Sequence, residues 1–420
     1  MARPSQKDDI VIAGYDMVTP LGTELEAEWE AFAAGRSGVR WIGKYEVQEN
    51  DAVRVAGEVP TIDFSSFNFY SERDEANWFS PVIFHSMLVA KRALAHAGLT
   101  IGPENAGRIG TTFSSAIGGL DAMILAEEKV RAGKTPHPFT NPNGCLNLVA
   151  GKVSILTGAQ GPIFSPVAAC ATGAASVASA AMLLRGGQAD AVIAGACDFP
   201  VIRSLFASFA SMNGAFKSFK TGDRGFENPA AVSRPFSKDR KGFVISEGAA
   251  ALIVTTRGYA EENSLAVRGV VEGIGMTSDA KHYVAPNLPT IVTCMREAIR
   301  NAGGDIYAVN AHAASTNVGD AVEIKAIKEV FGDDRELPIT ANKSQIGHTM
   351  GASSGIELIL ALEGMARGVI LPTLNYESDT KLPPIDPVAE GARPFEHHRV
   401  LSNSFGFGGC NVCIVIGHFN

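Results

Sequence analysis

The sequence predicts an α/β protein whose second half repeats the plan of the first. Short apolar runs typical of buried strands alternate along the chain with longer helix-like segments. The helix-like segment 347–368 resembles the one that follows Cys170, because both start with small residues, continue with larger aliphatic ones and end at glycine. The turn-like segments 111–115 and 310–315 also occupy comparable places. These parallels indicate a weak internal duplication.

In the first half, each expected element has its own local pattern. The apolar run 9–18 predicts a strand, and the segment 26–35 predicts a helix that ends at a glycine. Residues 80–98 are amphipathic and end with a glycine suited to the C′ position of a helix. The segment 108–115 predicts a strand that runs into a glycine turn, and the runs 189–198 and 247–256 predict two further strands.

In the second half, the pattern resumes with a predicted strand at 266–276 and a helix at 291–304. A strand at 306–315 and the helix 347–368 follow. We therefore expect one half over residues 1–258 and another over 259–420. The segment 221–240, rich in Gly, Asn and Arg, is expected to be a surface loop.

Composition excludes several classes of function. The formal net charge is -8 and the pI is near 5.7, which argues against nucleic-acid binding. Six cysteines in 420 residues are too few for a disulfide scaffold and indicate a reducing compartment. Cys410 and Cys413 lie on a predicted strand, where positions i and i+3 face opposite sides, so packing is expected rather than metal binding. No apolar run typical of a signal peptide occurs near Met1, and a cytoplasmic protein is expected.

The nearly uncharged stretch that begins at Ser165 allows three interpretations: a membrane span, a buried helix, or a helix that presents Cys170 to a substrate. Ala, Ser, Gly and Thr dominate it, and these residues contribute too little transfer free energy for a span. A helix start favours the thiolate through the helix dipole, which would make Cys170 a nucleophile. The alternative is a buried structural cysteine.

Two histidines occupy places where open α/β sheets put active sites. His312 ends a predicted strand, and His348 precedes the helix that resembles the Cys170 helix. One thiol and two imidazoles from two halves form a plausible catalytic site, although satisfied polar histidines are the alternative. The glycines beside Phe407, in "NSFGFGGCN", allow a tight turn whose N–H groups face an oxyanion, or simply a turn before the last strand.

Together these motifs resemble the β-ketoacyl-acyl-carrier-protein synthases, specifically their elongating class. The resemblance runs through "IVIAGYDMVTPLG", "RIGTTFSSAIGGL", "ACATGAASVASAAMLLRGG", "VNAHAASTNVGDAVEIKAI", "NKSQIGHTMGASSGIE" and "LSNSFGFGGCNV". It implies the thiolase-like duplicated fold, layered α-β-α-β-α with two mixed sheets, and a homodimer.

The resemblance also implies a role for each matching residue. Cys170 would carry the acyl chain, while His312 and His348 would promote malonyl decarboxylation. The remaining residues would support these three: a charged pair (Lys343 and Glu323), an oxyanion hole and gate (the N–H groups of Cys170 and Phe407, with Phe405 and Gly408 in the same turn), a wall of the acyl tunnel (Ile117) and a contact to the pantetheine arm (Thr316).

The implied reaction is the decarboxylative condensation of an acyl chain with malonyl-acyl carrier protein, giving a 3-oxoacyl-acyl carrier protein. Such an acyltransferase needs acyl carrier protein and acyl and malonyl thioesters, but no metal, cofactor, nucleic acid or membrane span. Carbon–carbon bond formation at a thioester requires a thiolate that is also a good leaving group.

Three departures from the family pattern are visible. Ala314 replaces a threonine expected to hold the pantetheine arm, Cys410 replaces another threonine, and Asp16 replaces an early glycine. They leave open a ketosynthase of a polyketide or specialised lipid pathway, or a chain-length-setting partner subunit, although such partners lack the cysteine. A thiolase would use a second cysteine in place of the second histidine.

Overall fold

The continuous apolar runs form the buried strands of a large mixed sheet. The structure is a computed structural model that describes residues 6–217, 227–333, 337–396 and 398–419. Four strands, buried almost throughout, carry the first half: β1 (Ile10–Val18), β4 (Ile109–Ser114), β6 (Ala191–Asp198) and β7 (Gly248–Thr256). Strands buried on both faces favour apolar side chains, which explains the long apolar runs of β1, β6 and β7. Strand β4 differs, because it also buries Thr111, Thr112 and Ser114.

The second half repeats this topology. With β5 (Ile163–Phe164), the first half has the strand order β5-β4-β6-β7-β1. The second half has the strand order β10-β9-β13-β14-β8. These strands are β8 (Gly269–Ser278), β9 (Ala308–Asn310), β10 (Ile339–Thr340), β13 (Arg399–Gly406) and β14 (Cys410–Gly417). In each half the three strands at the outer end are parallel and the other two are antiparallel.

The expectation of two separate sheets needs one correction. Strands β1 and β8 pair antiparallel over two residue pairs, Val11 with Val270 and Ile12 with Gly269. These two sets of five strands therefore form one continuous ten-stranded sheet. Pairing the two inner edges satisfies backbone groups that would otherwise be left open.

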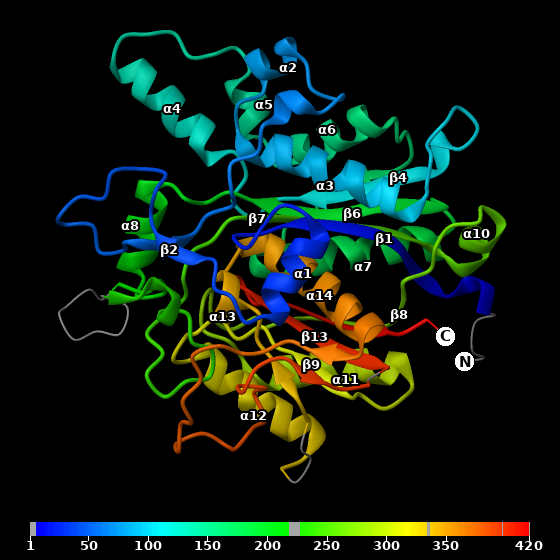
Figure 1. Ribbon diagram of the computed structural model, residues 1–420. Coiled ribbons are helices and arrows are strands. Elements are labelled where there is room, and N and C mark those ends of the chain that lie inside the picture. The colour runs from blue at the N-terminus through cyan, green and yellow to red at the C-terminus, as the bar shows by residue number, and fades with distance from the viewer. Residues whose placement is uncertain (1–5, 218–226, 334–336, 397, 420) are drawn as a thin grey trace.

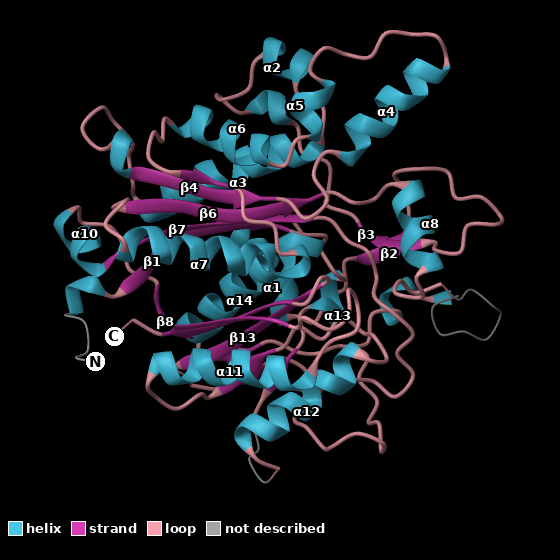
Figure 2. Ribbon diagram, turned by 180° about the vertical axis from the view of Figure 1, so that it is seen from behind, coloured by secondary structure: helices cyan, strands magenta, loops and turns pink. Residues whose placement is uncertain are grey.

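Helices cover both sides of each half and fill the space between them (Figures 1 and 2). Helices α3 (Pro81–Ala97) and α6 (Asn147–Thr157) lie outside the first five strands, and α11 (Leu288–Ala302) and α12 (Gly319–Phe331) lie outside the second five. Between them lie α7 (Thr172–Arg185) and α14 (Ser353–Arg367), which contact each other. The α-β-α-β-α layering is as expected.

The small residues of α7 are explained by this central position. A Cβ added to Gly173 would lie 2.6 Å from the backbone nitrogen of Gly355 on α14, so the two helices nearly touch. The stretch after Ser165 is thus a buried helix. Across the described residues we find no helix with the length and apolar character needed to span a bilayer.

The remaining elements lie around these layers. They are α1 (Leu25–Ala33), α2 (Glu72–Asn77), α4 (Leu120–Arg131), α5 (Thr140–Gly144), α8 (Arg203–Ser211), α10 (Arg257–Glu262), α13 (Lys343–Ile346), β2 (Val39–Trp41), β3 (Val55–Gly57), β11 (Val369–Ile370) and β12 (Arg393–Pro394).

The prediction that residues 221–240 form a surface loop is wrong for much of the part that the structure describes, because several of these residues are buried. Residues 221–226 lie outside the described residues, but Arg234, Ser237 and Arg240 are buried. The Arg240 guanidinium donates to the carbonyl oxygens of Thr316 at 2.9 Å and Ser237 at 2.8 Å. Polar composition was misleading here because these charges are paired inside the protein.

Candidate active site

Cys170 lies just ahead of α7, within a short 3-10 turn (Ala169–Ala171), rather than in the helix itself. Ala169 has a positive φ of 48°, an uncommon conformation for a residue with a side chain. Met350 has a φ of 49° and occupies the equivalent place, three residues before α14. The two halves therefore present Cys170 and the His348 segment on matching strained turns at the starts of the two central helices.

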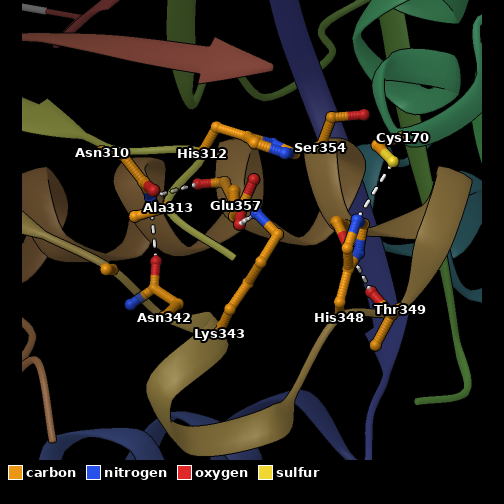
Figure 3. A network of polar contacts seen from close by, with 12 residues as sticks. Cys170, Asn310, His312, Ala313, Asn342, Lys343, His348, Thr349, Ser354 and Glu357 are labelled. Carbon is orange, nitrogen blue, oxygen red and sulfur yellow. Dashed lines mark hydrogen bonds and ion pairs between the residues drawn. The ribbon is translucent and has the colours of Figure 1, made fainter. Parts of the chain in front are cut away.

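His348 is directed at the thiol of Cys170. Its Nε2 lies 3.0 Å from Cys170 Sγ, as Figure 3 shows. On the other side of the ring, Nδ1 accepts the N–H of Met350 at 3.1 Å and lies 3.0 Å from Ser353 Oγ. A nitrogen that accepts an N–H carries no proton, so the proton of the neutral ring is on Nε2 and is donated to the sulfur.

His312 reaches the same space from the end of β9. Its ring centroid lies 5.6 Å from that of His348, and ligand atoms of Cys170, His312 and His348 all lie within 4.8 Å of one another. The carboxylate of Glu323 fixes this strand end, because it accepts the N–H groups of His312 at 2.9 Å and Ala313 at 2.7 Å. Asn403 also donates to Glu323, at 3.0 Å.

The prediction that Lys343 forms a charged pair with Glu323 is wrong, because Lys343 has a different partner. The Lys343 ammonium pairs with Glu357 of α14, and both side chains are buried. Figure 3 shows this pair beside the two histidines. Glu323 is instead committed to backbone N–H groups. Glu357 stands between Ile356 and the apolar run 358–362. This was the sequence feature that could have identified it, because a buried carboxylate needs a partner.

The electrostatics keep both imidazoles neutral. Burial, and secondly the positive charge of Lys343, hold the pKa of His312 and that of His348 well below the usual value of 6.5. Burial raises the pKa of Cys170 to about 11, although Lys343 and the N–H groups of Phe407 and Cys170 lower it. The helix-start position alone therefore does not give the low pKa that the sequence suggested, because burial outweighs it.

The turn after β13 approaches the nucleophile closely. A Cβ added to Gly406 would lie 2.3 Å from the carbonyl oxygen of Ala168 and 3.2 Å from the nitrogen of Cys170. This glycine brings the Phe407 N–H next to the sulfur. Gly408 has a φ of 82°, and its N–H donates to the carbonyl of Tyr283 at 2.8 Å. That N–H is already engaged, so Gly408 contributes the turn's conformation and not an oxyanion donor.

A cavity of about 600 Å³ opens onto the three residues. Its inner wall includes Ile117, Phe405 and Phe407, all partly buried, and Thr316 also lines it. Towards the surface it is bounded by exposed residues, namely Met212, Asn213, Lys241, His282, Asn317 and Val318. The cavity can hold an elongated, largely apolar ligand whose reactive end meets Cys170.

Cys170, His312 and His348 form a cluster of metal-ligand type. The hydrogen bonds of His348 favour a role other than metal binding, because the N–H of Met350 donates to Nδ1 and the ring proton therefore lies on Nε2. A protonated ring nitrogen has no lone pair for a metal, so the ring serves as a hydrogen-bond donor.

The three departures lie in different surroundings. Ala314 is buried and lines the cavity. Cys410 is partly buried at the start of β14, and Cys413 is buried in a separate apolar cluster, consistent with packing. Asp16 is buried on β1, 4.0 Å from Arg92, and burial raises its pKa well above the usual value.

Comparison with known proteins gives consistent matches. Residues 7–260 match the sequence model described as Beta-ketoacyl synthase, N-terminal domain, and residues 268–377 match Beta-ketoacyl synthase, C-terminal domain. A relative from Rhizobium meliloti (strain 1021), named 3-oxoacyl-[acyl-carrier-protein] synthase 2, is 34% identical, covering 98% of this chain and 99% of its own.

Solved structures agree in fold. A Beta-ketoacyl synthase from Burkholderia phymatum STM815 has a TM-score of 0.89 at 27% identity, covering 98% of this chain and 100% of its own. The ishigamide ketosynthase/chain length factor has a TM-score of 0.88 at 26% identity, covering 98% of this chain and 99% of its own.

Proposed function

This chain belongs to the β-ketoacyl synthase family, and from that premise we propose that it condenses an acyl chain with malonyl-acyl carrier protein to give a 3-oxoacyl-acyl carrier protein. In the first step Cys170 attacks the thioester of an acyl-acyl carrier protein. The carrier's thiol leaves with the proton of Cys170, and the acyl group stays on the enzyme. The N–H groups of Cys170 and Phe407 bind the oxyanion that forms in this exchange.

In the second step the malonyl thioester loses CO2, and the electron pair of the broken bond forms an enolate. His312 and His348 are neutral donors that stabilise the enolate oxygen. The enolate carbon attacks the carbonyl carbon of the acyl group on Cys170, the bond from that carbon to Sγ breaks, and the released thiolate takes up a proton from solvent. This step forms the carbon–carbon bond without a metal or redox cofactor.

The observation that carries this proposal is the contact of 3.0 Å between Cys170 Sγ and His348 Nε2, with His312 in the same enclosed space. Cys170 thereby receives a hydrogen bond that stabilises the thiolate against the burial that raises its pKa. Lys343 and Glu323 act through the histidines: the first by its charge and the second by fixing the His312 backbone.

The test is incubation of the protein with acyl-acyl carrier protein and malonyl-acyl carrier protein, with the product analysed by mass spectrometry. We expect an acyl adduct on Cys170 and release of a 3-oxoacyl-acyl carrier protein. Cys170→Ala should lose condensation but retain some malonyl decarboxylation, because the histidines remain. The absence of any adduct on Cys170 in the native protein would contradict the proposal and favour a chain-length-setting partner subunit.

A second candidate is the same chemistry on a specialised or polyketide chain. It is supported by Ala314, which lines the cavity where a threonine was expected to hold the pantetheine arm, while Thr316 remains. The lost hydrogen bond is worth about 0.5–1.5 kcal/mol. The longest and most oxidised acyl chain accepted in the condensation assay separates the two candidates.

The remaining parts of the proposal concern assembly. We propose a cytoplasmic homodimer that works with acyl carrier protein, with the chain divided at residue 258. The dimer is supported by apolar side chains exposed at and near the edge strand β5, namely Ile155, Ile163, Phe164, Val167 and Met182. Phe164→Asp should shift the protein to a monomer in sedimentation equilibrium, and an unchanged mass would place the interface elsewhere.

A further inference from the structure

A single buried carboxylate joins two segments of the site that belong to different halves of the chain. Asp198 is the last residue of β6 and has no exposed surface. Burial raises its pKa to about 6, so the group is mostly ionised at neutral pH. The proposed chemistry assigns Asp198 no step, and no motif in the sequence indicated its role.

The Oδ1 atom of Asp198 holds the turn after β4. It accepts the hydroxyl of Ser115 and, at 2.9 Å, the N–H of Ile117. Ser115 Oγ in turn accepts the N–H of Gly118 at 2.7 Å. Ile117 lines the cavity next to Cys170, so this atom fixes the position of a cavity wall.

The Oδ2 atom holds the turn that carries His348 and also contacts the Ile117 turn. It accepts the N–H of Gly351 at 2.7 Å and the N–H of Ala116 at 3.2 Å. A Cβ added to Gly351 would lie 2.7 Å from this oxygen, so the turn is pressed against the carboxylate. Gly351 follows directly after Met350, whose strained backbone aims its N–H at His348 Nδ1.

We propose that Asp198 is a positioning residue that fixes, through one carboxylate, both the His348 imidazole and the Ile117 wall of the cavity. The consequences for catalysis rest on the proposed function: His348 would govern decarboxylation, and the Ile117 wall would govern the acyl chain accepted. One carboxylate would then hold the residue that acts in decarboxylation and the wall that contacts the acyl chain in fixed relative positions.

The physical reason is the number of acceptors required. The two oxygens of Asp198 receive four hydrogen bonds, three of them from backbone N–H groups that cannot reverse their direction. An asparagine side chain at this position would offer only one oxygen. In either orientation of the amide, its NH2 group would face at least one backbone N–H. The backbone segment that carries this N–H would then move away.

The test compares Asp198→Asn with two variants at its hydrogen-bonded neighbours. Ser115→Ala removes a hydrogen bond at Oδ1, and Gly351→Ala adds a methyl group 2.7 Å from Oδ2, which also meets Thr172 and Ala116. Histidine ¹⁵N NMR of the free protein, with His348→Gln for assignment, reports the His348 tautomer. In parallel, malonyl-acyl carrier protein decarboxylation and acyl chain-length profiles are measured, with thermal unfolding as the check on folding.

For Asp198→Asn we expect a changed His348 spectrum and a kcat for decarboxylation lower by about 10- to 100-fold, with KM changed less than about threefold. Gly351→Ala should reproduce the changed His348 spectrum and the lower decarboxylation rate. Its methyl group would also lie 3.1 Å from Ala116 Cβ, so a change in the chain-length profile is expected as well. Ser115→Ala should alter the profile while decarboxylation stays within about threefold. These two variants decide the question if Asp198→Asn does not fold.

An unchanged His348 spectrum together with unchanged kinetics in folded Asp198→Asn, or in Gly351→Ala, would overturn the inference. The NMR readout needs no turnover. A native protein that is inactive on malonyl-acyl carrier protein would contradict the proposed function, while the His348 spectrum of the variants would still decide the role of Asp198.

Discussion

Gly406→Ala should disable the candidate oxyanion hole without touching a catalytic side chain. The added methyl group would lie 2.3 Å from the carbonyl oxygen of Ala168 and 3.2 Å from the nitrogen of Cys170. A non-bonded carbon and oxygen approach to about 3.3 Å, so the turn after β13 must retreat by about 1 Å. Both opposing atoms belong to the backbone and cannot rotate away.

A retreat of that size removes one oxyanion donor. A hydrogen bond of about 2.9 Å from the Phe407 N–H would lengthen to about 3.9 Å, which is no longer a hydrogen bond. Loss of one such donor costs about 10²- to 10³-fold in kcat, or about 2.7–4 kcal/mol of transition-state stabilisation. We therefore expect acylation of Cys170 to slow by about that factor, while Cys170, His312 and His348 remain in place.

The assay is the rate of acyl transfer to Cys170 from acyl-acyl carrier protein, followed by mass spectrometry of the intact protein. Gly107→Ala is the matched control, because a methyl group there meets no atom within 4 Å. Thermal unfolding of both variants separates overpacking, worth about 1–3 kcal/mol of stability, from loss of the donor. Acylation of folded Gly406→Ala within about threefold of the native rate would refute the reasoning.

The other predictions concern individual side chains. His348→Ala should lower malonyl decarboxylation by about 10²–10³-fold, because it removes an oxyanion donor; near-normal CO2 release would remove this ring from the site. Burial raises the pKa of Cys170 to about 11, so the rate of its alkylation by iodoacetamide should keep rising from about pH 7 to about pH 9.5. Mass spectrometry of the Cys170 peptide measures this rate. A plateau below about pH 8 would show a lower pKa. Lys343→Met should destabilise the protein by up to about 3–5 kcal/mol in urea unfolding, because it leaves Glu357 buried and unpaired. Burial raises the pKa of Glu357 above its unfolded value, so the loss should be larger at about pH 8 than at about pH 5.5, and equal losses would contradict this. Ile117→Phe should reduce kcat/KM for the longest accepted acyl chain by about tenfold or more, since overpacking costs about 1–3 kcal/mol; an unchanged product profile would place the acyl chain elsewhere.

Much of the fold was predictable because its determinants are local. Strands buried on both faces are mostly apolar, so β1, β6 and β7 were visible as long apolar runs. Gly98 ends α3 in the left-handed conformation that its place in the pattern indicated. The pairing of β1 with β8 was not predictable, because two residue pairs between distant segments leave no local pattern.

For the site, the sequence identified Cys170, His312 and His348, which the fold brings within 4.8 Å of one another at their ligand atoms. It identified the wrong partner for Lys343, because either Glu323 or Glu357 satisfies the same rule that a buried charge needs an opposite charge. The burial that raises the pKa of Cys170 was also beyond the sequence, since it depends on which segments cover the thiol.

The sequence by itself showed that the chain contains the residue types that the chemistry requires. It also determined where along the chain strands, turns and helices of small residues occur. Those properties depend on neighbours within a few positions. Only the tertiary structure decided that Gly406 lies against Cys170, and that Asp198 accepts N–H groups on both sides of the site. Contacts between segments far apart in the chain depend on how the two halves pack, and no local pattern in the chain encodes that packing.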